Sequence, residues 1–236
     1  MQLSVVIPAF NESKTIANTV NVIITYFKEK GLNIELLVVD DGSRDNTLDV
    51  LKTLDFPELK IIENVTNHGK GYSVRKGVLA AKGDYILFSD ADLSTPIKES
   101  EKFLDEIKNF DIAIGSRRLK NSDIKIRQPF YRVALGRVFS FMTSVIVLSG
   151  IKDTQCGFKM FRREVGHEIF KKQRLDKFAF DVEVLFIASL LDYSIKEIPV
   201  EWHNNRNSKV NPIKDPLLML KDMLVVRLNH LRGYYK

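Results

Sequence analysis

The stretch Tyr85-Ile86-Leu87-Phe88-Ser89-Asp90-Ala91-Asp92 joins a short apolar run to two carboxylates that stand one residue apart. The apolar run has the length and composition of a buried β-strand, so both acids are expected to project from the edge of a sheet. Hard divalent cations such as Mg²⁺ or Mn²⁺ prefer oxygen ligands and often bridge to substrate phosphates. The stretch therefore predicts a metal–diphosphate site, and the alternative is a polar turn after a strand.

Segments typical of strands and helices alternate on both sides of this stretch. Strands are expected at 3–8, 34–40, 59–63, 85–89 and 112–115, and helices at 12–30, 44–54, 70–82 and 98–108. Asn11 or Ser13 is expected to cap the first helix. Such alternation is typical of an α/β fold with a mostly parallel central sheet and helices on both faces.

Polar clusters follow four of the expected strands, at 8–12, 40–43, 90–92 and 116–118. Ligands of open α/β sheets bind at the carboxyl ends of the strands. Acids follow the second and fourth strands and arginines follow the fifth, a distribution that suits a nucleotide bound with a metal ion. Asp41 is interpreted as functional, and Asp45 as a helix cap.

The second half of the chain has a different pattern. It predicts helices at 128–148, 180–191 and 217–232, strands at 158–161 and 195–202, and a polar loop at 204–211. Pro212 and Pro216 are expected to set the start of the last helix. The first and last of these helices combine broad apolar faces with basic neighbours, as interfacial helices on membranes do, although a core or dimer stripe is the alternative.

Composition limits the class of protein. The chain has 236 residues, 44% of them hydrophobic and 28% charged, with a formal net charge of +6. Positive charge is concentrated between Lys108 and Arg137, a stretch that could attract phosphates or an anionic membrane; the alternative is a solvated basic face that aids solubility. Nucleic-acid binding is disfavoured, because aromatic residues are not interleaved and the acids would repel a phosphate backbone. A single cysteine, Cys156, excludes an internal disulfide and is interpreted as a packing residue.

Export and membrane signals are weak. No apolar stretch reaches the roughly 18–20 residues needed to cross a bilayer. The apolar run at 3–8 is too short for a signal peptide, and no basic residues precede it. We therefore expect neither a leader nor a membrane span.

Four further clusters each have two interpretations. The turn 67–71 fails both the Walker A and the dinucleotide patterns, yet Lys70 could still touch a phosphate; tight packing is the favoured reading. Arg117, directly after a strand, could hold a phosphate by two parallel hydrogen bonds. Asp153 and Gln155 could contact a sugar, or could only order a turn. The acids at 180–183 suit a helix start.

The quoted runs together resemble family 2 glycosyltransferases of the GT-A (Rossmann-like) fold. The resemblance spans residues 1 to about 210 and is carried by 6–12, 39–43, 90–96, 153–159 and 180–183. It is closest to polyprenyl-phosphate glycosyltransferases of the dolichyl-phosphate glucosyltransferase branch. It implies a catalytic domain at 1–210, with a nucleotide-binding half at 1–118 and an acceptor-binding half at 119–210. The C-terminal amphipathic basic helix is placed at 211–236.

The resemblance also implies roles for individual residues. Asp90, Asp92 and Arg117 would be catalytic, with Asp90 and Asp92 holding Mg²⁺ or Mn²⁺. The implied nucleotide-binding residues are Pro8, Ala9, Phe10, Glu12, Asp41, Lys70, Asp90 and Ala91. The expected acceptor- or sugar-binding residues are Arg117, Arg127, Arg132, Asp153, Gln155, Asp181, Arg206 and Lys209.

The implied reaction is inverting transfer of a hexose, glucose from UDP-glucose, to a polyprenyl phosphate. Ser94 stands where mannose synthases often carry Gln, which favours a sugar other than mannose. Transfer of mannose or N-acetylglucosamine, a saccharide or protein acceptor, and a nucleotide-binding membrane module without turnover are the alternatives. The expected location is peripheral, on the cytoplasmic side of a membrane, and a homo-oligomer is possible in solution.

Overall fold

The computed structural model of the chain describes residues 2–125, 143, 147, 150–203 and 214–236. The expected helix at 128–148 lies outside the described residues except for Thr143 and Val147, which are both buried. The expected loop at 204–211 also lies outside them. Four residues expected to bind the acceptor also lie outside the described residues: Arg127, Arg132, Arg206 and Lys209.

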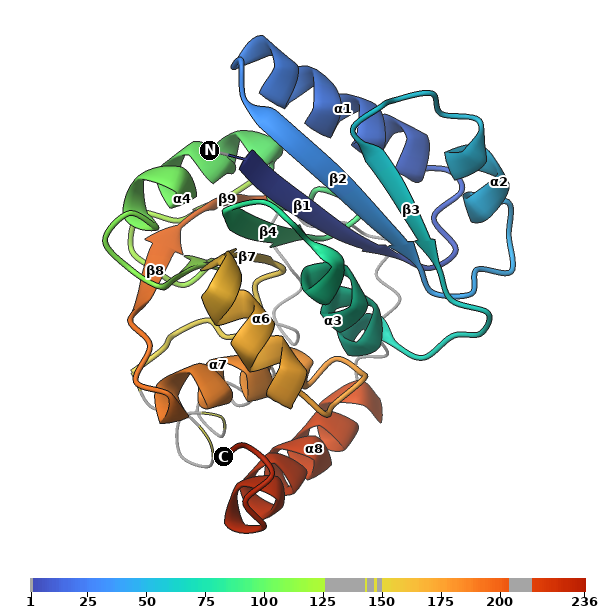
Figure 1. Ribbon diagram of the computed structural model, residues 1–236. Helices are drawn as coiled ribbons and strands as arrows, with labels where there is room; N and C mark the ends of the chain where they lie inside the picture. Colours follow the sequence, from blue (N-terminus) through green and yellow to red (C-terminus); the bar gives the residue numbers. More distant parts are fainter. Residues whose placement is uncertain (1, 126–142, 144–146, 148–149, 204–213) are drawn as a thin grey trace.

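A seven-stranded sheet with the order β3-β2-β1-β4-β7-β5-β8 forms the centre of the described fold (Figure 1). Its strands are β1 Gln2–Ala9, β2 Asn33–Asp40, β3 Leu59–Glu63, β4 Tyr85–Ser89, β5 Ile112–Ser116, β7 Phe158–Arg162 and β8 Ile195–Pro199. All neighbours pair in parallel except β7, which runs antiparallel between β4 and β5. The predicted mostly parallel α/β sheet is confirmed.

Helices cover both faces of this sheet, and each face has its own apolar core. The helices are α1 Ile16–Glu29, α2 Thr47–Lys52, α3 Lys70–Ala80, α4 Ser100–Glu106, α6 Arg163–Lys172, α7 Phe180–Leu190 and α8 Lys214–Leu231. Side chains of α1 and α4 share one core with Val5 and Ile7 of β1. Side chains of α3, α6, α7 and α8 share the other core with Val6. Successive residues of β1 thus face opposite cores, as a buried parallel strand requires.

The first helix begins at Ile16, four residues later than expected, and its N-cap Thr15 makes no side-chain cap bond. Asn11 has a φ of 53°, in the left-handed region that a helix cannot contain. Its side-chain oxygen accepts a bond from the Arg44 N–H at 2.8 Å. The expected cap therefore ties two loops together instead of starting the helix.

Several other expected boundaries differ. The helix expected at 44–54 is the shorter α2, and the one expected at 98–108 begins as the 3-10 helix η1, Ile97–Glu99, before α4. The strand expected at 195–202 ends at Pro199. The chain then changes sheets, and β9 Glu201–Trp202 pairs with β6 Asp123–Ile124. The helix α6 was not expected at all.

The helix α8 has two apolar sides. Met219, Met223 and Val226 are buried in the core, so part of this helix is a core element. Leu224, Leu228 and Leu231 lie on another side and are 56%, 47% and 79% exposed. Within the described ranges, no helix combines the length and apolarity that crossing a bilayer demands.

Candidate active site

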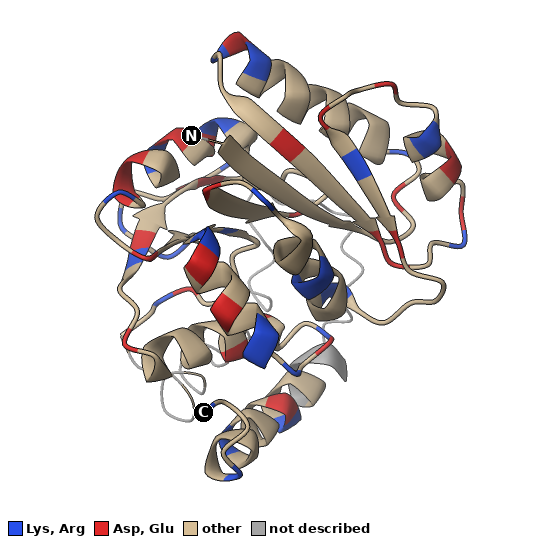
Figure 2. Cartoon of the chain, viewed as in Figure 1, with Lys and Arg blue, Asp and Glu red and all other residues tan. Residues whose placement is uncertain are grey.

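The acid pair lies in a tight turn after β4, where the sheet order reverses direction. β1 has β2 on one side and β4 on the other, so the chain crosses to opposite sides of β1. Crevices at such switch points bind ligands. Figure 2 shows acidic residues around the carboxyl ends of the strands. The predicted position of the acids, at the carboxyl end of the fourth strand, is confirmed.

Backbone contacts hold this turn in one shape. The Leu93 N–H donates to the Asp90 carbonyl at 3.1 Å, and Leu93 has a φ of 47°. The Ala91 carbonyl accepts a bond from the Thr19 hydroxyl at 2.5 Å. The Asp92 carboxylate accepts the Ser94 N–H at 2.9 Å and is exposed at the surface. The turn therefore presents both carboxylates from a fixed backbone.

Asp90 rests between a lysine and a glycine. Lys70 Nζ lies 2.6 Å from Asp90 Oδ1. A Cβ added to Gly157 would lie 2.1 Å from Asp90 Oδ2, so only glycine leaves room for this carboxylate. Tight packing was the favoured interpretation of the turn that contains Lys70, with contact to a phosphate as the other; the structure places Lys70 beside Asp90.

Behind this pair lies a second, buried one. Lys159 Nζ forms an ion pair with the Asp181 carboxylate and donates to the Cys156 carbonyl at 2.7 Å. Both side chains are almost fully buried, so Asp181, expected to bind acceptor or sugar, faces a lysine within the fold. Lys159 was not singled out from the sequence. A lysine inside the apolar strand 158–161 was the available signal, because a buried cation requires a partner.

The Asp41 carboxylate is buried and holds the loop that leads into α3. Its oxygens accept bonds from Asn64 Nδ2 and Asn67 Nδ2 at 2.9 and 2.8 Å. They also accept the backbone N–H groups of His68 and Gly69 at 3.1 and 2.8 Å. Nucleoside binding by Asp41 stays a prediction, and the structure gives this residue a role in positioning the turn before Lys70.

Arg117, after β5, forms the predicted two parallel bonds, but with a protein carboxylate. Its Nε and Nη2 lie 2.8 and 2.9 Å from the Asp153 oxygens, and its guanidinium carbon lies over the Trp202 ring, 5.4 Å from the ring centre. Burial would raise the pKa of the Asp153 carboxyl, but the charge and bonds of Arg117 hold that pKa well below its usual range. For Arg117, burial alone would lower the pKa of the guanidinium. The negative charge of Asp153 and, more weakly, that of Asp90 outweigh burial and raise this pKa above its usual value. The guanidinium therefore stays charged and lies within electrostatic reach of the acid pair.

The remaining predicted residues lie at or near this edge. Pro8 and Ala9 end β1, and the Ala9 carbonyl accepts the Asp41 N–H at 2.8 Å. Phe10 and Glu12 are half-buried in the following loop. Gln155 turns its side-chain amide toward Met219 Sδ, at 3.6 Å, on α8.

Cys156 is buried, and burial raises the pKa of its thiol to about 11. A thiol with this pKa is almost entirely protonated near neutral pH and is a poor nucleophile. The interpretation of Cys156 as a packing residue is confirmed.

The acid pair fits a hard divalent cation. Two carboxylates one residue apart provide oxygen ligands, and Mg²⁺ commonly takes one or two such groups together with substrate phosphates. Across the described ranges, no three or more His, Cys, Asp or Glu side chains gather into a metal-binding group. A bound diphosphate or solvent could supply further oxygen ligands.

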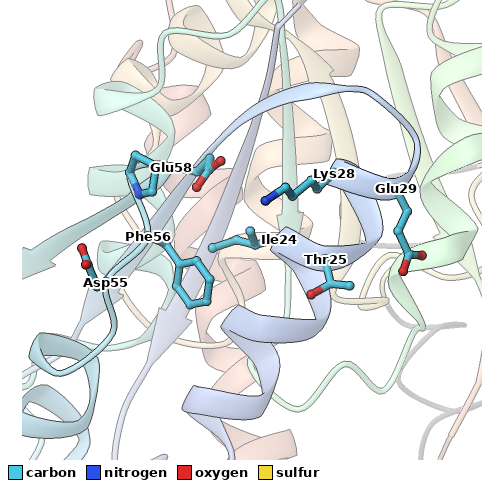
Figure 3. A pocket seen from close by; sticks show the side chains of 8 residues that line it. Ile24, Thr25, Lys28, Glu29, Asp55, Phe56 and Glu58 are labelled. Atoms are coloured by element: carbon cyan, nitrogen blue, oxygen red, sulfur yellow. The ribbon is translucent and has the colours of Figure 1, made fainter.

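A separate hollow of about 520 Å³ lies at the other end of α1 (Figure 3). Its lining combines Lys28 with three acids, Glu29, Asp55 and Glu58. The Glu58 carbonyl accepts the Leu36 N–H of β2, and Glu58 directly precedes β3, so the hollow adjoins the amino end of β3. It is remote from the acid pair and takes no part in the site.

Comparison with known proteins gives consistent matches. Residues 4–170 match the family model described as glycosyl transferase family 2. The chain is 36% identical to the dolichyl-phosphate beta-glucosyltransferase of Saccharomyces cerevisiae, over 99% of the chain and 76% of that protein. It is 34% identical to the human protein of that name, over 100% of the chain and 78% of the relative.

The fold also matches a solved enzyme. This is glucosyl-3-phosphoglycerate synthase from Mycobacterium tuberculosis, crystallised with Mn²⁺, UDP-glucose and phosphoglyceric acid. The TM-score is 0.70 at 17% identity, covering 97% of this chain and 79% of that one. At this identity the match establishes a shared fold.

Proposed function

The chain belongs to glycosyl transferase family 2, and from that premise we propose that it transfers glucose from UDP-glucose to a polyprenyl phosphate such as dolichyl phosphate. The observation that carries the proposal is the arrangement at the switch point: after β4, Asp90 is half-buried beside Lys70 and Asp92 is exposed. The relatives named dolichyl-phosphate beta-glucosyltransferase, which match nearly the whole of this chain, support the choice of sugar and acceptor.

Asp90 and Asp92 are proposed to hold Mg²⁺ or Mn²⁺, and a protein of the same fold binds Mn²⁺ with UDP-glucose. A bound divalent cation neutralises charge on the departing diphosphate. Lys70 adds a second positive charge at the same place. Pro8, Phe10 and Glu12 line the adjoining edge, where the nucleoside is proposed to lie.

The acceptor is an anion near neutral pH, so it needs no general base. One phosphate oxygen attacks the anomeric carbon, forming the new C–O bond. The bond from that carbon to the UDP oxygen breaks, and its electron pair leaves with UDP. Direct displacement inverts the anomeric centre. Arg117, held by Asp153 and kept charged, is proposed to attract the lipid phosphate toward the donor.

The exposed face of α8 is proposed to contact the membrane that holds the lipid. Leu224, Leu228 and Leu231 recur at helical spacing on this face, and Lys221 and Arg232 are exposed nearby. Figure 2 shows α8 as mostly uncharged, with basic segments and an acidic one. Apolar side chains beside basic ones suit an anionic interface. We propose peripheral attachment on the cytoplasmic side, where the anionic leaflet lies.

One assay tests the reaction. The protein is incubated with Mn²⁺, a short polyprenyl phosphate and either UDP-glucose, UDP-N-acetylglucosamine or GDP-mannose, and the lipid is weighed by mass spectrometry. We expect the lipid to gain one hexose with UDP-glucose, and Asp92→Asn to abolish the gain. A glycosylated lipid formed only with another donor would show that the proposed sugar, glucose, is wrong. No lipid product with any donor would reject the acceptor.

A further inference from the structure

We propose that Tyr235 and Glu183 are positioning residues for donor binding. They hold residues 173–177 against the start of α3, and these residues in turn fix Lys70 beside Asp90. The inference rests on the proposed function in one respect, namely that Lys70 contacts the diphosphate of the donor. It extends that function to residues far from the acid pair in the sequence.

The first contact is a buried tyrosine–carboxylate pair. The Tyr235 hydroxyl donates to Glu183 Oε1 at 2.5 Å, and Asn229 Nδ2 donates to the tyrosine oxygen at 3.3 Å. Tyr235 is 2% exposed and Glu183 is 0% exposed. A buried carboxylate is costly unless it is hydrogen-bonded, so the geometry of this pair is narrowly constrained.

The second contact joins Glu183 to the segment before α7. Glu183 Oε2 accepts the backbone N–H groups of Arg174 and Leu175 at 3.1 and 2.7 Å. The two oxygens of the Glu183 carboxylate thus accept hydrogen bonds from different parts of the chain: Oε1 from Tyr235, and Oε2 from the backbone at 174–175. Because Tyr235 occupies Oε1, it sets how the carboxylate presents Oε2 to the backbone at 174–175.

The third contact brings this segment onto the turn that carries Lys70. The Tyr72 N–H donates to the Asp176 carbonyl at 3.1 Å. A Cβ added to Gly69 would lie 2.4 Å from that carbonyl oxygen, and one added to Gly71 would lie 2.6 Å from the Leu175 oxygen. The segment therefore touches the backbone on both sides of Lys70.

Asp41 holds the same turn from a different direction, through the Gly69 N–H at 2.8 Å. Gly69 has a φ of 113°, a conformation that favours glycine and leaves the backbone permissive. The turn is therefore clamped between Asp41 and residues 173–177. Loosening one side of the clamp would let Lys70 sample positions away from Asp90.

The test is Tyr235→Phe, which removes one hydroxyl and keeps the ring. The dissociation constant of UDP-glucose with Mn²⁺ is measured by calorimetry well below the melting temperature. We expect binding to weaken about three- to tenfold, equivalent to roughly 0.7–1.4 kcal/mol, with the KM for the lipid unchanged. The matched control is Tyr193→Phe, which removes a hydroxyl bonded to Glu168 elsewhere on the fold and should leave donor binding unaltered.

Two further variants separate positioning from stability. Glu183→Gln keeps an oxygen for the backbone N–H groups and should retain tighter donor binding than Glu183→Ala. In a Lys70→Met background, Tyr235→Phe should weaken donor binding no further, because its effect passes through Lys70. Additive effects, or a Tyr235→Phe protein with a lower melting temperature and unaltered donor binding, would overturn the proposal. A wild-type protein that does not bind UDP-glucose would instead reject the proposed function.

Discussion

Two lysine–aspartate pairs flank the ring of Phe88, and they differ in exposure. The Lys70–Asp90 pair is at the rim, where its side chains are 24% and 34% exposed. The Lys159–Asp181 pair is sealed, with side chains 1% and 6% exposed. The two ammonium groups lie 5.3 and 5.9 Å from the centre of the Phe88 ring.

The difference shows that a lysine–aspartate pair can serve ligand binding when it is partly exposed and structural stability when it is buried. A partly exposed pair is screened by solvent, so its charges contribute less to stability than those of a buried pair, and its members are accessible to a ligand. A buried pair depends on both partners, because removing one leaves an uncompensated charge. The outer pair should therefore control turnover, and the inner pair should control folding and the Cys156–Gly157 backbone beneath Asp90.

The largest expected effect is on the outer pair. Asp90→Asn should lower turnover about a thousandfold, since removing one group that stabilises transition-state charge costs roughly this much. Its melting temperature should stay within a few degrees of the wild type. Turnover is followed by release of UDP and stability by thermal unfolding. A large drop in melting temperature with turnover retained would reverse the assignment.

The inner pair should show the opposite pattern. Lys159→Met should lower the free energy of unfolding by about 3–5 kcal/mol, because it strands a buried carboxylate. Urea titration measures this change. Adding Asp181→Asn should restore part of the loss, since the stranded charge is removed. If the double variant were less stable than the single one, the pair would not be coupled as the structure shows.

A smaller effect is expected from Lys70→Met. Donor binding should weaken about 10- to 100-fold, or roughly 1.4–2.8 kcal/mol, through loss of one charge near the diphosphate. Calorimetry with UDP-glucose and Mn²⁺ gives the constant. The free energy of unfolding should be nearly unaltered. If Lys70→Met bound the donor as tightly as wild type, Lys70 would not be a donor-binding residue.

The smallest effect concerns pH and a third pair, Arg117–Asp153. Because the pKa of folded Asp153 is depressed, the unfolded state takes up the proton first as pH falls. The stability from this pair is therefore complete above the unfolded pKa of about 3.9 and declines below it. Wild type should lose about 1 kcal/mol more than Asp153→Asn between pH 5 and 3. Urea titrations of both proteins at pH 5 and pH 3 measure the loss of unfolding free energy. Equal losses in wild type and Asp153→Asn would show that the pair does not contribute to the pH dependence of stability.

Much of the fold could be predicted because its signals are local. The strands at 59–63 and 85–89 agree with the structure residue for residue, since short apolar runs bounded by polar turns are typical of buried strands. The boundary errors arose where tertiary contacts overrode a local pattern. Asn11 bonds to the backbone of Arg44 rather than capping α1, and the chain changes sheets after Pro199.

The sequence by itself determined the alternation of strands and helices, the position of Asp90 and Asp92 at a strand end, and the family resemblance. Each depends on residues adjacent in the chain. Only the tertiary structure decided which polar and charged side chains meet: Lys159 with Asp181, 22 residues apart, and Glu183 with Tyr235, 52 residues apart. Periodicity shows which face of an element is buried but not which element covers it. The partners of a buried charge are therefore known only once the chain has packed.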